Sequence, residues 1–218
     1  MKDIPVKRGR RYISGLVAEG EHEHQDFKYA ISDARKIARS VSAFANAGGG
    51  RLLIGIKDNG IIAGVRNEED VYVVELAAHR YCEPPQEVDF AAYSIDTGMN
   101  VIVATIPQAT TRPVRVREDD GHLRAYIRVA DENIAAHPLM VRAWQYTGPL
   151  TFTLNADASA LLDILDAAAE DGLDPAEAPL RLGMSARRTE DMIVTLAAAG
   201  IIRFIYNTQG FRIVRIRS

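Results

Sequence analysis

Cysteine and tryptophan each occur only once in this 218-residue sequence. The single cysteine, Cys82, excludes an internal disulfide and any zinc site built from cysteines alone, and it fits a reducing compartment. No run approaches the roughly 18 consecutive apolar residues of a membrane helix, and the first residues lack the apolar core of a signal peptide. We therefore expect a soluble, cytoplasmic protein with no membrane partner.

Neither sign of charge is in large excess. The formal net charge is −3, and charged residues make up 25% of the chain against 47% apolar residues, which are average values for a globular protein. This balance excludes a protein that coats nucleic acid by bulk charge, so any such contact has to come from local basic patches. The length suits one larger domain and one small domain.

Residues 42–65 carry the strongest structural pattern in the chain. Ser32 is expected to cap a helix whose apolar stripe includes Ile37 and Val41, and the run of glycines at 48–50 ends that helix. Residues 52–56 then predict a buried strand, and Asn59-Gly60 predicts a tight turn into a returning strand at 61–65. Further on, Asn67 is expected to cap a helix that runs to about residue 81.

Together with the segment upstream, this block resembles a known family. The residues that carry the resemblance are Glu21, Asp26-Phe27-Lys28, Ala43-Phe44-Ala45-Asn46, Gly49-Gly50, Ile54-Gly55-Ile56, Asp58, Gly60 and Gly64-Val65. They resemble the Schlafen/Alba-type domain, which is described as a DNA-binding domain of bacterial regulators and forms the nuclease core of Schlafen proteins. The resemblance continues to about Gln145, with Tyr126-Ile127-Arg128 similar to a late strand of the family. The sequence departs from the family at Asp26, where glutamate is usual, and at 130–132, where a glycine-serine pair is usual.

The fold class that follows is α+β, with a mixed sheet and flanking helices over residues 1–147. A short helix at 138–145 is expected to close this domain before a boundary near Gly148-Pro149. Residues 150–218 predict three helices followed by a two-stranded hairpin, which resembles a winged helix-turn-helix. In that resemblance Arg187 and Arg188 begin the helix that would enter a DNA groove. This segment holds seven arginines and nine acidic residues, so DNA contact and protein docking both remain open for it.

Basic residues cluster in three other places. Arg35, Lys36 and Arg39 fall off the apolar stripe of the first predicted helix, so its exposed side is basic. A predicted hairpin carries two rows in which alternate residues share a face, namely Arg115 and Arg117 on one strand and Arg124, Tyr126 and Arg128 on the other. If both rows face the same way, they form a surface for nucleic acid; the alternative is an exposed sheet whose arginines pair with nearby acids. Residues 1–12 are also basic, as a solvated chain end or as an arm that contacts phosphates.

The resemblance also implies a catalytic possibility. Glu21, Asp26 and Asp58 stand at what look like the places of the three carboxylates in the Schlafen nucleases, and carboxylates are suitable ligands for Mg²⁺ or Mn²⁺. The alternative is that Glu21 and Asp26 are solvated loop acids and that Asp58 opens the turn, where aspartate is favoured. No cofactor is expected unless this cluster is a nuclease site.

The sequence and the resemblance together predict a nucleic-acid-binding protein, specifically a bacterial DNA-binding transcriptional regulator that acts as a homodimer on DNA rather than RNA. Two alternatives remain open. One is a metal-dependent ribonuclease that uses the three carboxylates, and the other is a docking or assembly module that works through its C-terminal segment.

Overall fold

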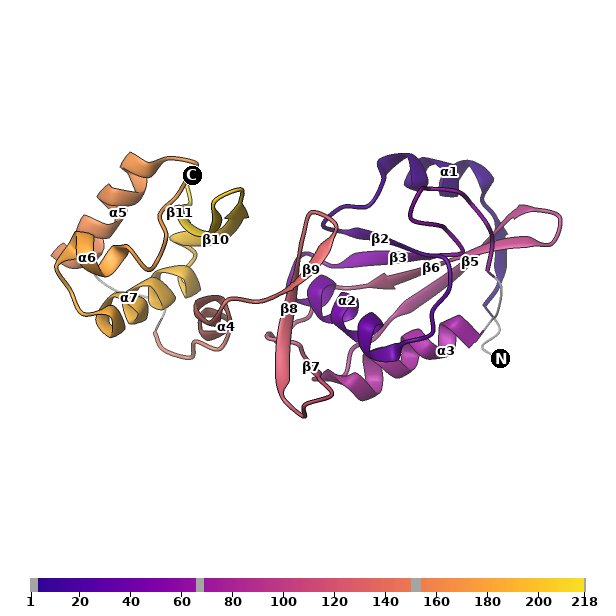
Figure 1. The fold of residues 1–218 in the computed structure, drawn as a ribbon, viewed down its shortest axis with the longest axis horizontal. Coiled ribbons are helices and arrows are strands. Elements are labelled where there is room, and N and C mark those ends of the chain that lie inside the picture. Colours follow the sequence, from indigo (N-terminus) through magenta and orange to yellow (C-terminus); the bar gives the residue numbers. More distant parts are fainter. Residues whose placement is uncertain (1–3, 66–68, 150–153, 218) are drawn as a thin grey trace. The chain divides into compact units, whose positions relative to one another are not determined.

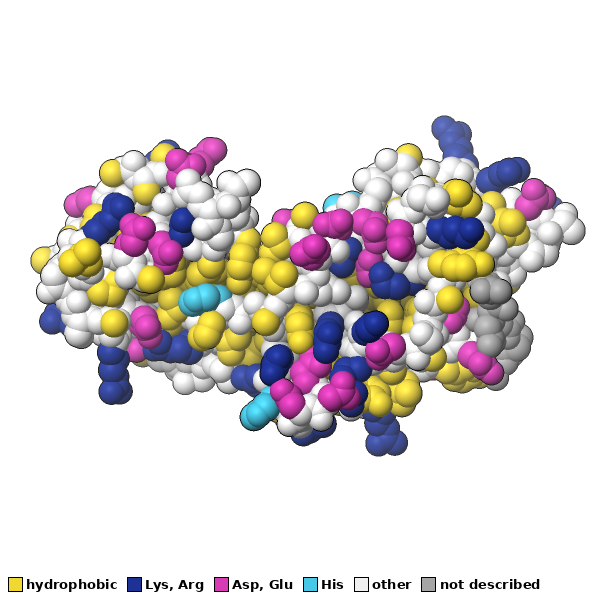
Figure 2. Space-filling view, in the orientation of Figure 1, with side chains coloured by type: hydrophobic (Ala, Val, Ile, Leu, Met, Phe, Trp, Pro, Cys, Tyr) yellow, Lys and Arg dark blue, Asp and Glu magenta, His cyan; other side chains and the backbone are white. Residues whose placement is uncertain are grey.

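The computed structural model describes residues 4–65, 69–149 and 154–217, which divide into two compact units, Met1–Ala136 and His137–Ser218. The first unit contains a mixed sheet with flanking helices, which confirms the predicted α+β class (Figure 1). Across the described ranges, no helix is long and apolar enough to cross a membrane. Basic and acidic side chains are intermingled over much of the face of the first unit seen in Figure 2.

The first unit is built on a five-stranded sheet in the order β1-β5-β6-β3-β2. Its strands are β1 (Val6–Arg8), β2 (Gln25–Lys28), β3 (Gly50–Ile54), β5 (Asp89–Asp96) and β6 (Met99–Ile106). The pairs β1–β5 and β2–β3 are parallel, and the central pairs β5–β6 and β3–β6 are antiparallel. Because side chains alternate along a strand, Leu53 and Val103 enter one apolar cluster while Leu52 and Ala104 enter the other.

Helices cover both faces of this sheet. Helix α1 (Arg10–Glu19) packs Ile13 and Leu16 onto one face. Helix α2 (Ala34–Asn46) lies on the other with α3 (Glu69–Leu76), which continues as a π-helical turn at Ala77–Tyr81 (Figure 1). The predicted stripe of α2 is buried, including Ile37 and Val41.

The second side of α2 is also buried, because it packs against a second sheet. This four-stranded antiparallel sheet has the order β4-β7-β8-β9 and consists of β4 (Cys82–Glu83), β7 (Arg115–Arg117), β8 (Leu123–Val129) and β9 (Glu132–Ala135). Ser42 and Asn46 meet it with their polar atoms. The Ser42 hydroxyl donates to Val114 O over 2.8 Å and accepts from Tyr126 N over 3.0 Å. The side chain of Asn46 exchanges two hydrogen bonds with the backbone of Val114 and donates to Tyr126 O.

Several local predictions were wrong in detail. The cap of α2 is Asp33 rather than Ser32, since the Asp33 carboxylate accepts from Arg35 N and Lys36 N. In the glycine run, Gly49 takes the positive φ of the turn, whereas Gly50 begins β3, where a Cβ atom would lie 2.2 Å from the ring of Phe44. Residues 61–65 form no regular strand; they make one isolated bridge, between Ile56 and Ile62, and separate backbone hydrogen bonds to Gly55, Lys57 and Asn100. The predicted cap Asn67 lies outside the described residues.

The second unit contains the predicted helices and hairpin. Its elements are α4 (Pro138–Trp144), α5 (Ala156–Ala168), α6 (Ala178–Leu182), α7 (Ala186–Ala198), β10 (Ile202–Asn207) and β11 (Gly210–Arg215). Helix α4 was expected to close the first domain, but its Arg142 pairs with Glu190 and Asp191 of α7. The helix therefore belongs to the second unit, and the winged-helix classification of that unit stays a prediction.

Asn46→Ala should lower the free energy of unfolding by about 2–4 kcal/mol, because it removes the side-chain partner of the buried Val114 N–H and of the Tyr126 carbonyl. Urea denaturation measures this change. Asn100→Ala is the matched control, since Asn100 is exposed on β6 and should change stability by less than about 0.5 kcal/mol. Equal losses in the two variants would contradict the role given to Asn46.

Candidate functional site

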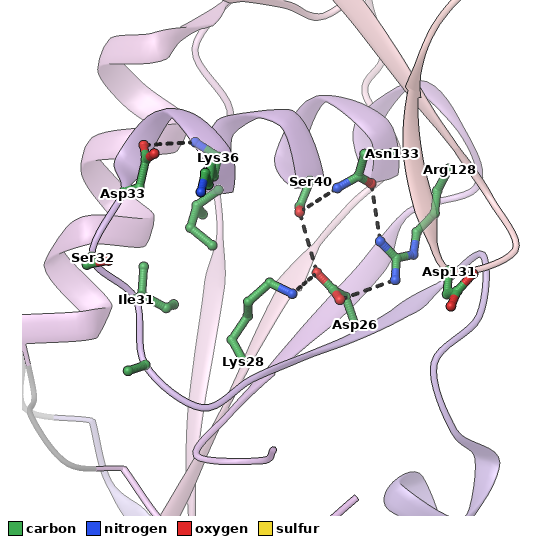
Figure 3. Close-up of a pocket in the computed structure, with 12 residues that line it drawn as sticks. Asp26, Lys28, Ile31, Ser32, Asp33, Lys36, Ser40, Arg128, Asp131 and Asn133 are labelled. Atoms are coloured by element: carbon green, nitrogen blue, oxygen red, sulfur yellow. Dashed lines mark hydrogen bonds and ion pairs between the residues drawn. The ribbon is translucent and has the colours of Figure 1, made fainter. Parts of the chain in front are cut away.

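A polar pocket of about 370 Å³ lies between β2, the start of α2 and the β8–β9 turn (Figure 3). Its lining includes three basic and three acidic residues, namely Lys28, Lys36, Arg128, Asp26, Asp33 and Asp131. Ser40 and Asn133 complete its polar side. The pocket thus combines residues more than 100 positions apart in the sequence, which the two sheets bring together around α2.

Asp26 is the centre of this site. Its carboxylate is 3% exposed and lies 2.7 Å from Lys28 Nζ and 3.2 Å from Arg128 Nη2. Ser40 Oγ donates to it over 3.5 Å, and Asn133 links Ser40 to Arg128 through two further hydrogen bonds (Figure 3). A buried carboxylate needs this kind of pairing, because desolvation otherwise disfavours its charge.

Glu21 and Asp26 titrate as a linked pair. Burial raises the pKa of Glu21, and its hydrogen bond with Asp26 raises it further. Burial acts on Asp26 in the same direction, but the hydrogen bond from Glu21 and the charges of Lys28 and Arg128 outweigh it and hold the pKa of Asp26 below its usual range. Glu21 also accepts from Phe27 N over 2.8 Å. The prediction that both are solvated loop acids is therefore wrong for Asp26.

The third carboxylate of the predicted cluster, Asp58, is exposed in the turn after β3. Within the described ranges, no three acidic, histidine or cysteine side chains are grouped so that they could hold a metal ion. A cation at Asp26 would also meet the positive charges of Lys28 and Arg128. The three carboxylates do not fit a shared metal site in this arrangement, and the ribonuclease interpretation stays a prediction.

The basic side of α2 is largely paired with acids of the β7–β8 turn. Arg39 makes a bidentate pair with Glu118, with contacts of 3.0 and 2.6 Å, and Arg35 pairs with Asp119. Lys36 is exposed at the pocket, and its ammonium group makes no ion pair or hydrogen bond in the part of the chain that the structure describes. Of the three, only Lys36 therefore has a side chain free of direct ion pairs, although Asp33 in the same pocket interacts with its charge.

The two rows of the β7–β8 hairpin do not share a face. Val116 is the register partner of Arg124, so Arg115 and Arg117 lie on the opposite face from Arg124, Tyr126 and Arg128. Tyr126 and Arg128 are 8% and 5% exposed, which corrects the prediction that they face a ligand. The physical reason is that α2 covers that face. Burial and a hydrogen bond to Glu118 raise the pKa of Tyr126 to about 12.

The exposed arginines of the hairpin are partly neutralised. Arg117 pairs with Glu83 over 2.9 Å and Arg124 with Asp120 over 2.7 Å, both on the surface. Arg115 is half-buried and has no charged partner among the described residues. In the second unit, Arg187 is exposed at the start of α7, while Arg188 pairs with Asp157 over 2.5 Å.

Sequence reasoning missed Lys28, Ser40 and Asn133 as parts of the site. Lys28 stands two residues after Asp26 on β2, so the two share a face, and this spacing was a usable signal. Ser40 lies in the middle of α2, and a single polar residue within a helix gives no indication in the sequence that it belongs to a site. Asn133 lies on β9, a strand that the sequence did not predict.

Asp26→Asn should lower the free energy of unfolding by about 3 kcal/mol at pH 7, because it leaves the buried Arg128 without its counter-charge. Since the folded pKa of Asp26 lies below its unfolded value, the ionic stabilisation is fully present above about pH 3.9 and is lost as pH falls through the folded pKa. The difference between wild type and variant should therefore narrow below about pH 4, as urea denaturation at pH 7 and pH 3 would show.

Asp58→Asn serves as the control for this experiment, because Asp58 is an exposed residue of the turn. Its effect should be within about 0.5 kcal/mol at both pH values. A loss in Asp26→Asn that is the same at pH 7 and pH 3 would show that the charge of Asp26 does not stabilise the fold.

Comparison with known proteins places this geometry in a family. The family described as Schlafen, AlbA_2 matches residues 21–137, which is more than half of the chain. No curated protein matches. Among solved structures, the DIP2311 protein from Corynebacterium diphtheriae is similar at 19% identity and a TM-score of 0.42 over 87% of this chain, which spans 34% of the length of that protein. The family match includes β2, α2, β3 and the β7–β8 hairpin, and the chain therefore belongs to the Schlafen, AlbA_2 family.

Proposed function

We propose that this protein binds nucleic acid and acts as a DNA-binding transcriptional regulator. Membership of the Schlafen, AlbA_2 family carries this proposal, because it indicates nucleic-acid binding and covers most of the first unit. With a net charge of −3, the chain has to make the contact through local groups of basic residues.

The first unit offers such groups in modest number. Lys36 presents its ammonium group at the pocket, and Arg115 has no acidic partner among the described residues. Arg117 and Arg124 are held only by surface ion pairs, which are worth about 0–1 kcal/mol, so a phosphate can compete for them. Because Arg124 lies across the sheet from Arg115 and Arg117, these residues support separate contacts rather than one continuous surface.

The proposal of a regulator rather than a general binder draws on the second unit. Its helices and hairpin follow the order of a winged helix, and Arg187 is exposed in the first turn of α7, where a recognition helix would contact DNA. We propose that the protein acts as a homodimer on DNA, as such regulators commonly read two half-sites. A second unit that docks to another protein is the alternative.

Binding should weaken as salt rises, because contacts to phosphates release counterions. We expect a linear fall of log K with log salt concentration for labelled duplex DNA, single-stranded DNA and tRNA, measured by fluorescence anisotropy between about 50 and 200 mM salt, with duplex DNA bound most tightly. Absence of binding to all three at the lowest salt would defeat the proposal.

Arg187→Ala should weaken binding to duplex DNA by roughly tenfold if α7 reads DNA, because a base or phosphate contact is worth about 1–3 kcal/mol. Arg181→Ala is the comparison, since Arg181 is exposed on α6 and paired with Glu177. Unchanged duplex binding by Arg187→Ala would favour the docking role of the second unit.

A further inference from the structure

A second basic surface lies outside the segment that the family matches. It consists of residues at β1 and the first turn of α1, namely Lys7, Arg8, Arg10, Arg11 and Tyr12, and we call it the β1–α1 surface. All five side chains are exposed, and Figure 2 shows basic side chains projecting from the first unit around α1. Tyr12 is 46% exposed and packs against Tyr93 with ring centroids 5.0 Å apart.

This surface differs from the basic groups of α2 and the β7–β8 hairpin because most of its cations make no ion pair among the described residues. The ion pair that it does contain joins Arg10 Nη1 to Asp96 over 4.0 Å, and the Arg10 side chain is still 71% exposed. Lys7, Arg8 and Arg11 make no ion pair within the described residues. Three of the four cations therefore have no counter-charge within ion-pair distance among the described residues, unlike Arg39, Arg117 and Arg124.

The surface is also shaped to receive a ligand. A shallow depression of about 710 Å³ is lined by Arg8, Arg10, Arg11 and Tyr12, with Gly15 in its wall. Glu19 also lines it, but its carboxylate is paired with Arg51. Glycine destabilises the interior of a helix relative to alanine. At Gly15 no atom lies within 4 Å of where a Cβ atom would stand, so packing does not require a glycine there. A bare helix backbone beside an exposed tyrosine leaves room for a flat or extended group.

Protection of an edge strand explains only part of this arrangement. β1 is three residues long and lies at the edge of the sheet, where basic residues prevent pairing with another chain. That reason applies to Lys7 and Arg8 but not to Arg10 and Arg11, which lie on a helix. It also leaves the exposed Tyr12 and the depression unexplained.

We infer that the β1–α1 surface holds the sugar–phosphate backbone of the bound nucleic acid, with the ring of Tyr12 against a sugar or base. This inference rests on the proposed function and names a surface for it. Arg8, Arg10 and Arg11, which line the depression, contact phosphate oxygens, and the tyrosine supplies the flat surface that nucleic-acid-binding proteins use beside such contacts. The contact is to the backbone, so it does not depend on the sequence of the nucleic acid.

The test compares variants of the full chain by fluorescence anisotropy with duplex DNA, single-stranded DNA and RNA of one sequence. Arg11→Ala should reduce the slope of log K against log salt by about one, and Arg10→Ala/Arg11→Ala by about two, with roughly tenfold or greater weakening at 100 mM salt. Arg80→Ala is the matched control, because it removes the same charge from an exposed arginine of the first unit and should change neither quantity. The three nucleic acids distinguish which backbone the surface prefers.

Gly15→Leu separates binding from folding. Leucine is a strong helix former, so this variant should raise the melting temperature while it fills the depression and weakens binding severalfold. If both Arg10→Ala/Arg11→Ala and Gly15→Leu bind as wild type does, the inference is overturned while the proposed function stands. If wild type itself binds no nucleic acid at low salt, both fall. The same variants are also tested for binding to anionic phospholipid vesicles. If they lose vesicle binding relative to wild type but keep nucleic-acid binding, the inference is overturned and the surface is a membrane contact.

Discussion

The buried ion pair between Asp26 and Arg128 holds the first unit together at the point where its two sheets approach α2. Asp26 comes from the five-stranded sheet and Arg128 from the four-stranded one, and Ser40 and Asn133 connect the pair to α2 and to β9. A buried charge is tolerated only when it is paired and hydrogen-bonded, so each of these groups constrains the others. The consequence is that one sheet cannot shift against the other without exposing an unpaired charge.

This interaction also changes how the acidic and basic residues of the domain are to be understood. Asp26 and Arg128 looked like a metal ligand and a phosphate contact, respectively, when each was considered alone. In the folded chain they neutralise each other, and the same happens between Arg39 and Glu118. The cations that make no ion pair among the described residues are Lys36, Arg115 and, on the β1–α1 surface, Lys7, Arg8 and Arg11. Charge in the sequence is therefore a poor guide to charge at the surface of this protein.

The two sides of α2 illustrate what could and could not be predicted. Its apolar stripe was visible at helical spacing, and β3 of the sheet that it covers was recognisable from its apolar run. Ser42 and Asn46 lie on the other side, outside the apolar stripe, yet both residues are buried and bond the backbone of Val114 and Tyr126. These polar atoms have partners only because the second sheet packs against α2. The periodicity of residues within a helix carries no information about a partner so distant in sequence.

Local patterns in the sequence determined the helix and strand types of many segments and the hairpins β7–β8 and β10–β11, because each of these depends on residues close together in the chain. The ordered series of such patterns determined the class of fold and the family. Tertiary structure alone decided which face of β8 is buried, that Asp26 pairs with Arg128 across 102 positions, and that Asp58 stays in a separate, exposed turn. These outcomes depend on which elements pack against which. A charged side chain becomes a ligand contact or a structural counter-ion according to the neighbours that packing supplies, and those neighbours are distant in sequence.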